Sequence, residues 1–239
     1  MITSYKFLSS AITAALTCVL HTTALAYTSN VDNLNLVVPD GDLDGVQNSQ
    51  VLGGLAGSIT HVSVTLNLSG GLNGDLYACL YHGSSPAVLL NRVGRSAANP
   101  LGYPDAGFGP DTALNQFVFD DQALHDVHLY RSFGYALNPS GQLTGHWQPD
   151  GRLLDPLSAA PLFDESPRLN PLSLFNAGDP NGVWTLYLAD VSALGESTLL
   201  SWGLDLTIIP EPSVMALCLL GLGAMTLRSR GARRSPGHG

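Results

Sequence analysis

Apolar and polar residues alternate along much of this chain with a period of two, most clearly toward its C-terminal end. In residues 200–208 every second side chain is apolar, and the intervening ones are Ser, Gly, Asp and Thr. Residues 182–189 place Trp184 and two leucines on one face, with β-prone residues opposite. Both patterns are typical of half-buried strands.

The segment between these two stretches, residues 190–198, contains the Asp, Ser, Gly and Glu of a loop. The simplest interpretation is an antiparallel hairpin with a long loop. This hairpin would direct Trp184 and Trp202 into one core, where an aromatic side chain buries roughly 150–250 Å².

Shorter stretches with strand patterning precede this hairpin. They cover residues 34–38, 62–68, 74–80, 85–90, 114–119 and, more weakly, 127–130. Residues 91–112 are rich in Gly, Pro and Asn and predict a long surface loop. The repeated short strands predict an all-β fold.

Composition favours a β-rich domain outside the cell. Charged residues make up only 12% of the 239 residues, whereas there are 26 Gly and 15 Pro, which fits an all-β secreted domain better than a helical enzyme. Residues 27–209 contain 16 Asp and 2 Glu against 5 Arg, a net charge of −13. This acidity argues against a nucleic-acid partner, and it fits either cation binding or simple solubility.

The N-terminal end carries a hydrophobic segment. Residues 1–26 combine Lys6, an apolar run and the small-residue site Ala24-Leu25-Ala26, which is the pattern of a cleaved secretory signal. An uncleaved membrane anchor is the alternative. The mature domain is then expected at residues 27–209.

The C-terminal end carries a second hydrophobic segment, the apolar and helix-prone residues 214–227. The arginines that close it are Arg228, Arg230, Arg233 and Arg234. A helix of this length reaches only about 21 Å of the ~30 Å bilayer core, and arginine snorkelling or local thinning closes the gap. The arginines are expected to stay inside and to stop transfer, so that this short transmembrane helix leaves the acidic domain outside.

An acidic motif follows the first expected strand. Asp40, Asp42 and Asp44 alternate before Gly45, which is the spacing of calcium loops. An EF-hand does not fit, because its twelfth position would be Val51 and no amphipathic helix flanks the motif. Calcium held by the three aspartates is one hypothesis, and an Asx-turn loop without metal is the other.

Catalytic motifs are lacking in the sequence. Neither Gly-x-Ser-x-Gly nor His-Glu-x-x-His occurs, and Cys79 is the only cysteine between the hydrophobic ends. We therefore assign no catalytic residue and expect no enzyme, while a Ser-His-Asp set assembled from distant positions stays open. Cys79 is expected to be a buried apolar residue, and Asp75 a turn-fixing side chain.

The expected hairpin also carries a family pattern. It reads Asn-Gly-x-Trp-Thr-Leu from Asn181, then Asp190, Gly195 and Ser201-Trp202-x-Leu204-x-Leu206. This pattern resembles the end of the P domain (Homo B domain) of subtilisin-like proprotein convertases. Gly74-Asp75-Leu76 and Phe119-Asp120-Asp121 match earlier parts of that family's pattern, whereas the Pro-rich residues 152–171 are an insertion relative to it.

The P-domain resemblance implies a jelly-roll-like β-sandwich over residues 27–209. Such domains usually accompany a protease domain, for which the chain has no room between its hydrophobic ends. A link to serine endopeptidases therefore follows only by association.

The tail carries a second resemblance. Pro210-Glu211-Pro212 follows the last expected strand directly and precedes the apolar segment and the arginines. These three parts in this order resemble the PEP-CTERM sorting signal, which would cover residues 210–239. The resemblance implies that exosortase, a membrane peptidase of bacteria with exopolysaccharide envelopes, is a partner, after a transient stay in the inner membrane.

Together these features predict an exported, non-catalytic protein of the cell surface or extracellular matrix in a Gram-negative-type bacterium. Its β-sandwich is expected to be structural or adhesive, with exopolysaccharide as a further partner. Two alternatives stay open. One is a calcium-stabilised module that binds a glycan or a protein, and the other is an accessory domain of a serine endopeptidase system.

Overall fold

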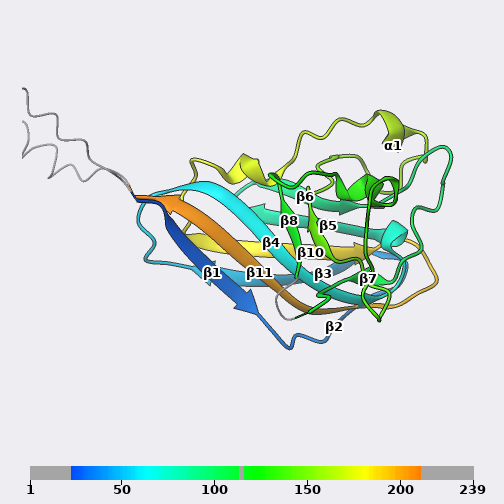
Figure 1. Ribbon diagram of the computed structural model, residues 1–239, viewed down its shortest axis with the longest axis horizontal. Coiled ribbons are helices and arrows are strands. Elements are labelled where there is room, and N and C mark those ends of the chain that lie inside the picture. Colours follow the sequence, from blue (N-terminus) through cyan, green and yellow to red (C-terminus); the bar gives the residue numbers. More distant parts are fainter. Residues whose placement is uncertain (1–22, 113–115, 211–239) are drawn as a thin grey trace, which may run out of the picture. The chain divides into compact units, whose positions relative to one another are not determined.

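The computed structural model describes residues 23–112 and 116–210, which form two β-sheets (Figure 1). The larger sheet contains β1 (Leu25–Val31), β2 (Leu36–Val38), β4 (Ser58–Gly70), β7 (Gly107–Phe108), β8 (Phe117–Asp120), β9 (Gly145–Trp147) and β11 (Ser197–Ile209). Its main order is β1-β11-β4-β8-β9, with β2 paired to β11 and β7 to β4. Only the β8–β9 pair among these described strands is parallel.

The smaller sheet has the order β3-β10-β5-β6 and is antiparallel throughout. Its strands are β3 (Asp42–Leu52), β5 (Leu76–His82), β6 (Ser85–Asn91) and β10 (Gly182–Asp190). Short helical turns occur in the connections, at η1 (Asn73–Asp75), η2 (Val127–Ser132), α1 (Leu162–Glu165) and η3 (Leu172–Phe175). The all-β prediction is confirmed.

The predicted hairpin between residues 182–189 and 200–208 is wrong, because its two strands belong to different sheets. β10 lies between β3 and β5, and β11 lies between β1 and β4. The period of two identifies the buried face of each strand but carries no information about its neighbours. The connection at residues 191–196 therefore crosses from one sheet to the other.

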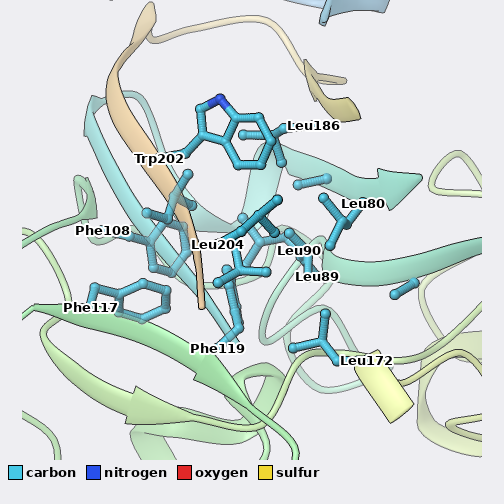
Figure 2. Packing of buried hydrophobic residues seen from close by; sticks show 14 of the residues in the cluster. Leu80, Leu89, Leu90, Phe108, Phe117, Phe119, Leu172, Leu186, Trp202 and Leu204 are labelled. Carbon is cyan, nitrogen blue, oxygen red and sulfur yellow. The ribbon is translucent and has the colours of Figure 1, made fainter. Parts of the chain in front are cut away.

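The other half of that prediction is confirmed, since Trp184 and Trp202 are buried in one core. Each indole N–H has an acceptor: Trp184 donates to the Pro180 carbonyl at 3.0 Å, and Trp202 donates to Asn48 Oδ1 at 2.7 Å. Figure 2 shows side chains of both sheets, including Trp202 from β11 and Leu186 from β10, directed into this shared interior.

Within β11 the inward face starts one residue earlier than predicted. Leu199 is buried and Leu200 is only half-buried, because the ladder with β4 shifts register between Leu199 and Ser201. Such a bulge reverses the alternation locally. From Trp202 to Ile208 the predicted alternation holds.

Four strands, β1, β3, β7 and β9, were not predicted from the sequence, and β7 lies within residues 91–112, which were expected to be a surface loop. β1 begins at Leu25, so cleavage at the expected site after Ala26 falls inside this strand. The expected strand at 127–130 is instead the 3₁₀ turn η2, because the Asp126 carboxylate accepts the His128 backbone N–H at 2.9 Å and starts a turn.

The two hydrophobic ends lie almost entirely outside the described residues. This applies to residues 1–22, and to Glu211, Pro212 and the arginines that follow. No helix in the described part of the chain is long and apolar enough to cross a membrane. The expected signal peptide, sorting motif and transmembrane helix therefore stay predictions.

Replacing Trp202 by alanine should lower the free energy of unfolding by roughly 3–5 kcal/mol, because the ring is 1% exposed and its loss leaves a cavity between the sheets. Urea unfolding of the two proteins measures this difference. Val51→Ala is the control, since Val51 is 77% exposed and its loss should cost under about 0.5 kcal/mol. A similar loss for both variants would contradict the shared core.

Candidate functional site

A polar groove lies on the outward face of the larger sheet, across its three longest strands. The alternation that buries Trp202 turns Ser201, Gly203 and Asp205 outward from β11. The register places Gly203 between Asn30 of β1 and Thr65 of β4. The side chains of these neighbours therefore gather around a position that has none.

Gly203 lies beneath two of the groove's side chains and is buried. A Cβ atom at this position would lie 2.0 Å from Asn30 Oδ1 and 2.6 Å from Thr65 Oγ1. The amide and the hydroxyl thus lean over the glycine, and a larger residue would push both side chains aside.

Two adjoining hollows form what we call the outer-face groove. The first has a volume of about 210 Å³, and eight of its ten lining residues have polar side chains, namely Thr28, Asn30, Asp32, Thr65, Asn67, Gln116, Ser201 and Asp205. The second, of about 350 Å³, is lined by Asp32, Asn33, Asn35, Asn67, Leu200 and Ser201. Asp32, Asn67 and Ser201 line both hollows, so the two adjoin.

Much of the hydrogen-bonding capacity in the groove is unused. Within the described part of the chain, the side chains of Asn30, Asp32, Thr65 and Ser201 form no hydrogen bond. Thr28 donates to Asp205 Oδ1, and Asn67 Oδ1 accepts from Gln142 at 3.2 Å. No Lys or Arg is among the described lining residues, so the charge of the groove is negative.

The acidic motif lies elsewhere, at the start of the smaller sheet. Asp42 and Asp44 are in β3 rather than in the expected loop, because β3 extends to pair Asp42 with Asp190. Asp42 Oδ1 accepts the backbone N–H of Asp44 at 2.9 Å, and Asp40 Oδ2 accepts that of Leu194 at 3.2 Å. Among the described residues, no group of three or more metal-ligating side chains is arranged to hold a metal.

A buried charged cluster lies close to this motif. Arg92 donates to Asp75 Oδ1 at 3.0 Å and to the Gly74 carbonyl at 2.9 Å, so Asp75 is half of a buried ion pair as well as part of a turn. Asp190 is 1% exposed, and its Oδ2 has no hydrogen-bond partner. Burial raises the pKa of Asp190 to about 7, and the neighbouring Asp75 and Asp40 carboxylates act in the same direction.

A second buried cluster contains His128. Its Nδ1 lies 2.6 Å from Asp150 Oδ2 and its Nε2 lies 3.0 Å from the Arg95 carbonyl, so both ring nitrogens face acceptors. Burial opposes the charged imidazolium, but the Asp150 carboxylate outweighs it and raises the pKa of His128. Arg152 adds a contact of 3.2 Å to Asp150. These contacts hold both ring nitrogens of His128 within the buried cluster.

Two other candidates for reactive chemistry are also engaged in structure. His82 places its two ring nitrogens 3.1 and 2.7 Å from the carbonyls of Val183 and Asp179, and its ring stacks on Trp184. Cys79 is fully buried, and this burial raises the pKa of its thiol to about 11. A thiol with such a pKa stays protonated and unreactive at neutral pH.

The outer-face groove was not predicted from the sequence. Ser201, Gly203 and Asp205 stood out as the polar face of a strand, but their partners Asn30 and Thr65 were not assigned to the same surface. Asn30 lies in β1, whose strand character is masked in the sequence by the adjoining signal-like segment.

Comparisons with known proteins add little to this geometry. No protein-family model and no curated protein sequence matches the chain. Among solved structures, the serine protease of Aeromonas sobria is similar at a TM-score of 0.36 and 15% identity, over 80% of this chain and 28% of the other. The same protease in complex with its chaperone ORF2 gives 0.37 and 13%, over 79% and 27%.

This chain therefore spans less than a third of the length of the chains it matches. These low similarities do not bear on function. The resemblances to the P domain and to the PEP-CTERM signal stay predictions.

Replacing Asp190 by asparagine should stabilise the protein more near pH 8 than near pH 5, by roughly 2–3 kcal/mol. Between the ordinary Asp value of 3.8 and about 7, folded Asp190 keeps a proton that the unfolded chain has lost. The wild type therefore loses stability as the pH rises through this window, whereas a neutral asparagine does not. Urea unfolding at both pH values measures the difference.

Asp42→Asn is the matched control for this experiment, because Asp42 is exposed and pairs with Asp190 across the ladder. It should show no pH-dependent gain. Other titrating groups, His128 included, affect the wild type and both variants alike. Equal gains for Asp190→Asn at the two pH values would show that Asp190 is ionised when folded.

The calcium hypothesis has a direct test of its own. If Asp40, Asp42 and Asp44 bind calcium in the folded state, millimolar calcium should raise the melting temperature of the wild type, because a ligand of the folded state stabilises it by mass action. Asp42→Ala should abolish this shift. If calcium leaves the melting temperature of the wild type unchanged, the hypothesis is wrong.

Proposed function

We propose that this chain is an exported, non-catalytic protein of the cell surface or extracellular matrix, in which the β-sandwich has a structural or adhesive role. The observation that carries the proposal is the order of segments along the chain. One sandwich uses the residues from Leu25 to Ile209, and Pro210-Glu211-Pro212, an apolar stretch and an arginine-rich end follow without a spacer.

In this proposal the tail is a sorting signal. The domain crosses the inner membrane, residues 214–227 halt in the bilayer, and an exosortase-type peptidase acts at the extended Pro210-Glu211-Pro212 segment. Proline lacks a backbone N–H and disfavours helix in the residue before it, which keeps such a segment extended and accessible to a peptidase. The protein then leaves the membrane for the surface or matrix.

Two features of the described residues support a non-catalytic role. The ring nitrogens of His82 and His128 all lie against protein oxygen atoms, so both imidazoles are engaged in the structure of the sandwich. The thiol of Cys79 is buried. The finer assignment of the sandwich as jelly-roll-like and P-domain-like belongs to the same proposal, and the crossing from β10 to the other sheet at β11 supports it.

Replacing Pro210-Glu211-Pro212 by three alanines should retain the protein in the inner-membrane fraction, because the peptidase then lacks its recognition segment. An epitope between Gly53 and Gly54 makes the protein visible, since a side chain at either glycine meets no neighbour within 4 Å. Membrane and released fractions are compared over time by immunoblot.

Arg228→Lys is the matched control, because it keeps the positive charge that follows the apolar segment and should be released at the wild-type rate. Release of the triple-alanine variant at that same rate would show that the segment is no sorting signal.

A further inference from the structure

From the outer-face groove we infer that this protein binds a neutral oligosaccharide on the outward face of its larger sheet. This inference rests on the proposed function, since it names the chemical class of ligand that an exported adhesive sandwich would hold. Its basis is the combination of unused polar groups, negative charge and two adjoining hollows in one place.

The side chains of the groove match the hydrogen-bonding chemistry of a sugar. A sugar hydroxyl both donates and accepts, and it is matched by side chains that do the same or that accept strongly. Asn30 offers an amide with two donors and one acceptor, Ser201 offers a hydroxyl, and Asp32 offers a carboxylate. None of the three is occupied by another described residue.

The negative charge of the groove favours a neutral ligand. Asp32 and Asp205 line the groove, and no described lining residue is Lys or Arg. A uronate, sulfate or phosphate group would meet two carboxylates without a counter-charge, which disfavours anionic polymers. The unpaired hydroxyls of a neutral sugar carry no such penalty.

The groove has room for more than one sugar unit, because its two adjoining hollows of about 210 and 350 Å³ share Asp32, Asn67 and Ser201 in their linings. The turn after β1 sets its far end, because Asn33 and Asn35 adopt left-handed backbone conformations with φ of 57° and 47°. Asparagine tolerates this conformation better than most residues. Both asparagines line the second hollow.

The groove is built on paired strands. Its residues in β1, β4 and β11 are held by antiparallel ladders, and Gly203 beneath Asn30 and Thr65 is buried. A site built on paired strands loses little conformational freedom on binding. Trp202 beneath it is only 1% exposed, so recognition would come from polar edges and not from a stacked ring.

The test uses the full chain, purified in detergent, and neutral gluco-, manno- and galacto-oligosaccharides from disaccharide to hexasaccharide, with a uronate oligosaccharide series beside them. Isothermal titration should show binding to at least one neutral series, with affinity rising with length. Asn30→Ala and Ser201→Ala should each weaken it by roughly threefold to tenfold, the loss expected for one hydrogen bond.

Both side chains are solvent-accessible and unbonded among the described residues, so their removal leaves the fold intact. Gln47→Ala, on the exposed face of the smaller sheet, is the control and should bind as the wild type does. Gly203→Ala places a methyl group against Asn30 and Thr65, whose side chains must move aside, and it should weaken binding. Its unfolding curve shows whether it still folds.

Three results would overturn the inference: no binding to any neutral series, tighter binding to the uronate series, or binding that Asn30→Ala and Ser201→Ala leave unchanged. Each is separable from failure of the proposed function. If the protein is released normally but does not bind these sugars, only the groove assignment is wrong. If it binds the sugars but the triple-alanine variant is released at the wild-type rate, only the sorting proposal is wrong.

Discussion

The structure depends on the burial of one apolar face from each sheet in a single core. Trp184 and Trp202, on consecutive strands of opposite sheets, fill this interior together. Because β11 alternates strictly beyond its bulge, fixing Trp202 inward also fixes Gly203 and Asp205 outward. The position of the outer-face groove is therefore a direct consequence of core packing on the reverse side of the same strand.

Charged groups stabilise the parts of the chain that lack regular ladders. The irregular segments around residues 92–95, 126–128 and 150–152 are joined by buried contacts of Arg92, His128 and Arg152 with aspartates and carbonyls. Such pairs add little net stability compared with apolar replacements, but breaking one partner is costly because the other stays buried and unpaired. Asp190 Oδ2 has no partner, and burial raises the pKa of this carboxyl to about 7, which favours the neutral form and lowers the cost of burying it.

How far the sequence predicted this structure differs between fold and site. Alternation correctly predicted the buried faces of β4 and β10 and the burial of both tryptophans, because burial imposes a period of two on a strand. It could not assign sheets, because ladder partners leave no trace in the period. For the same reason the groove could not be predicted. Ser201 and Asp205 were recognisable as a polar face, but Asn30 lies near the other end of the sequence and comes beside them only because β1 pairs with β11.

The pairing of Leu25 with Ile208 brings the first and last described strands together at one rim of the larger sheet (Figure 1). This arrangement defines a mechanical path. If the protein is held at its C-terminal end while a ligand pulls on the groove, the load runs along β11 between Ser201 and Ile209. It then acts in shear on the rungs that this strand shares with β1 and β4, so that many hydrogen bonds resist together instead of opening one at a time. Cleavage after Ala26 would remove the pairs that Leu25 and Ala26 form with Ile208 and Thr207, which lie nearest the C-terminal attachment point. At that end of β11, only the pairing with β4 would then resist the force.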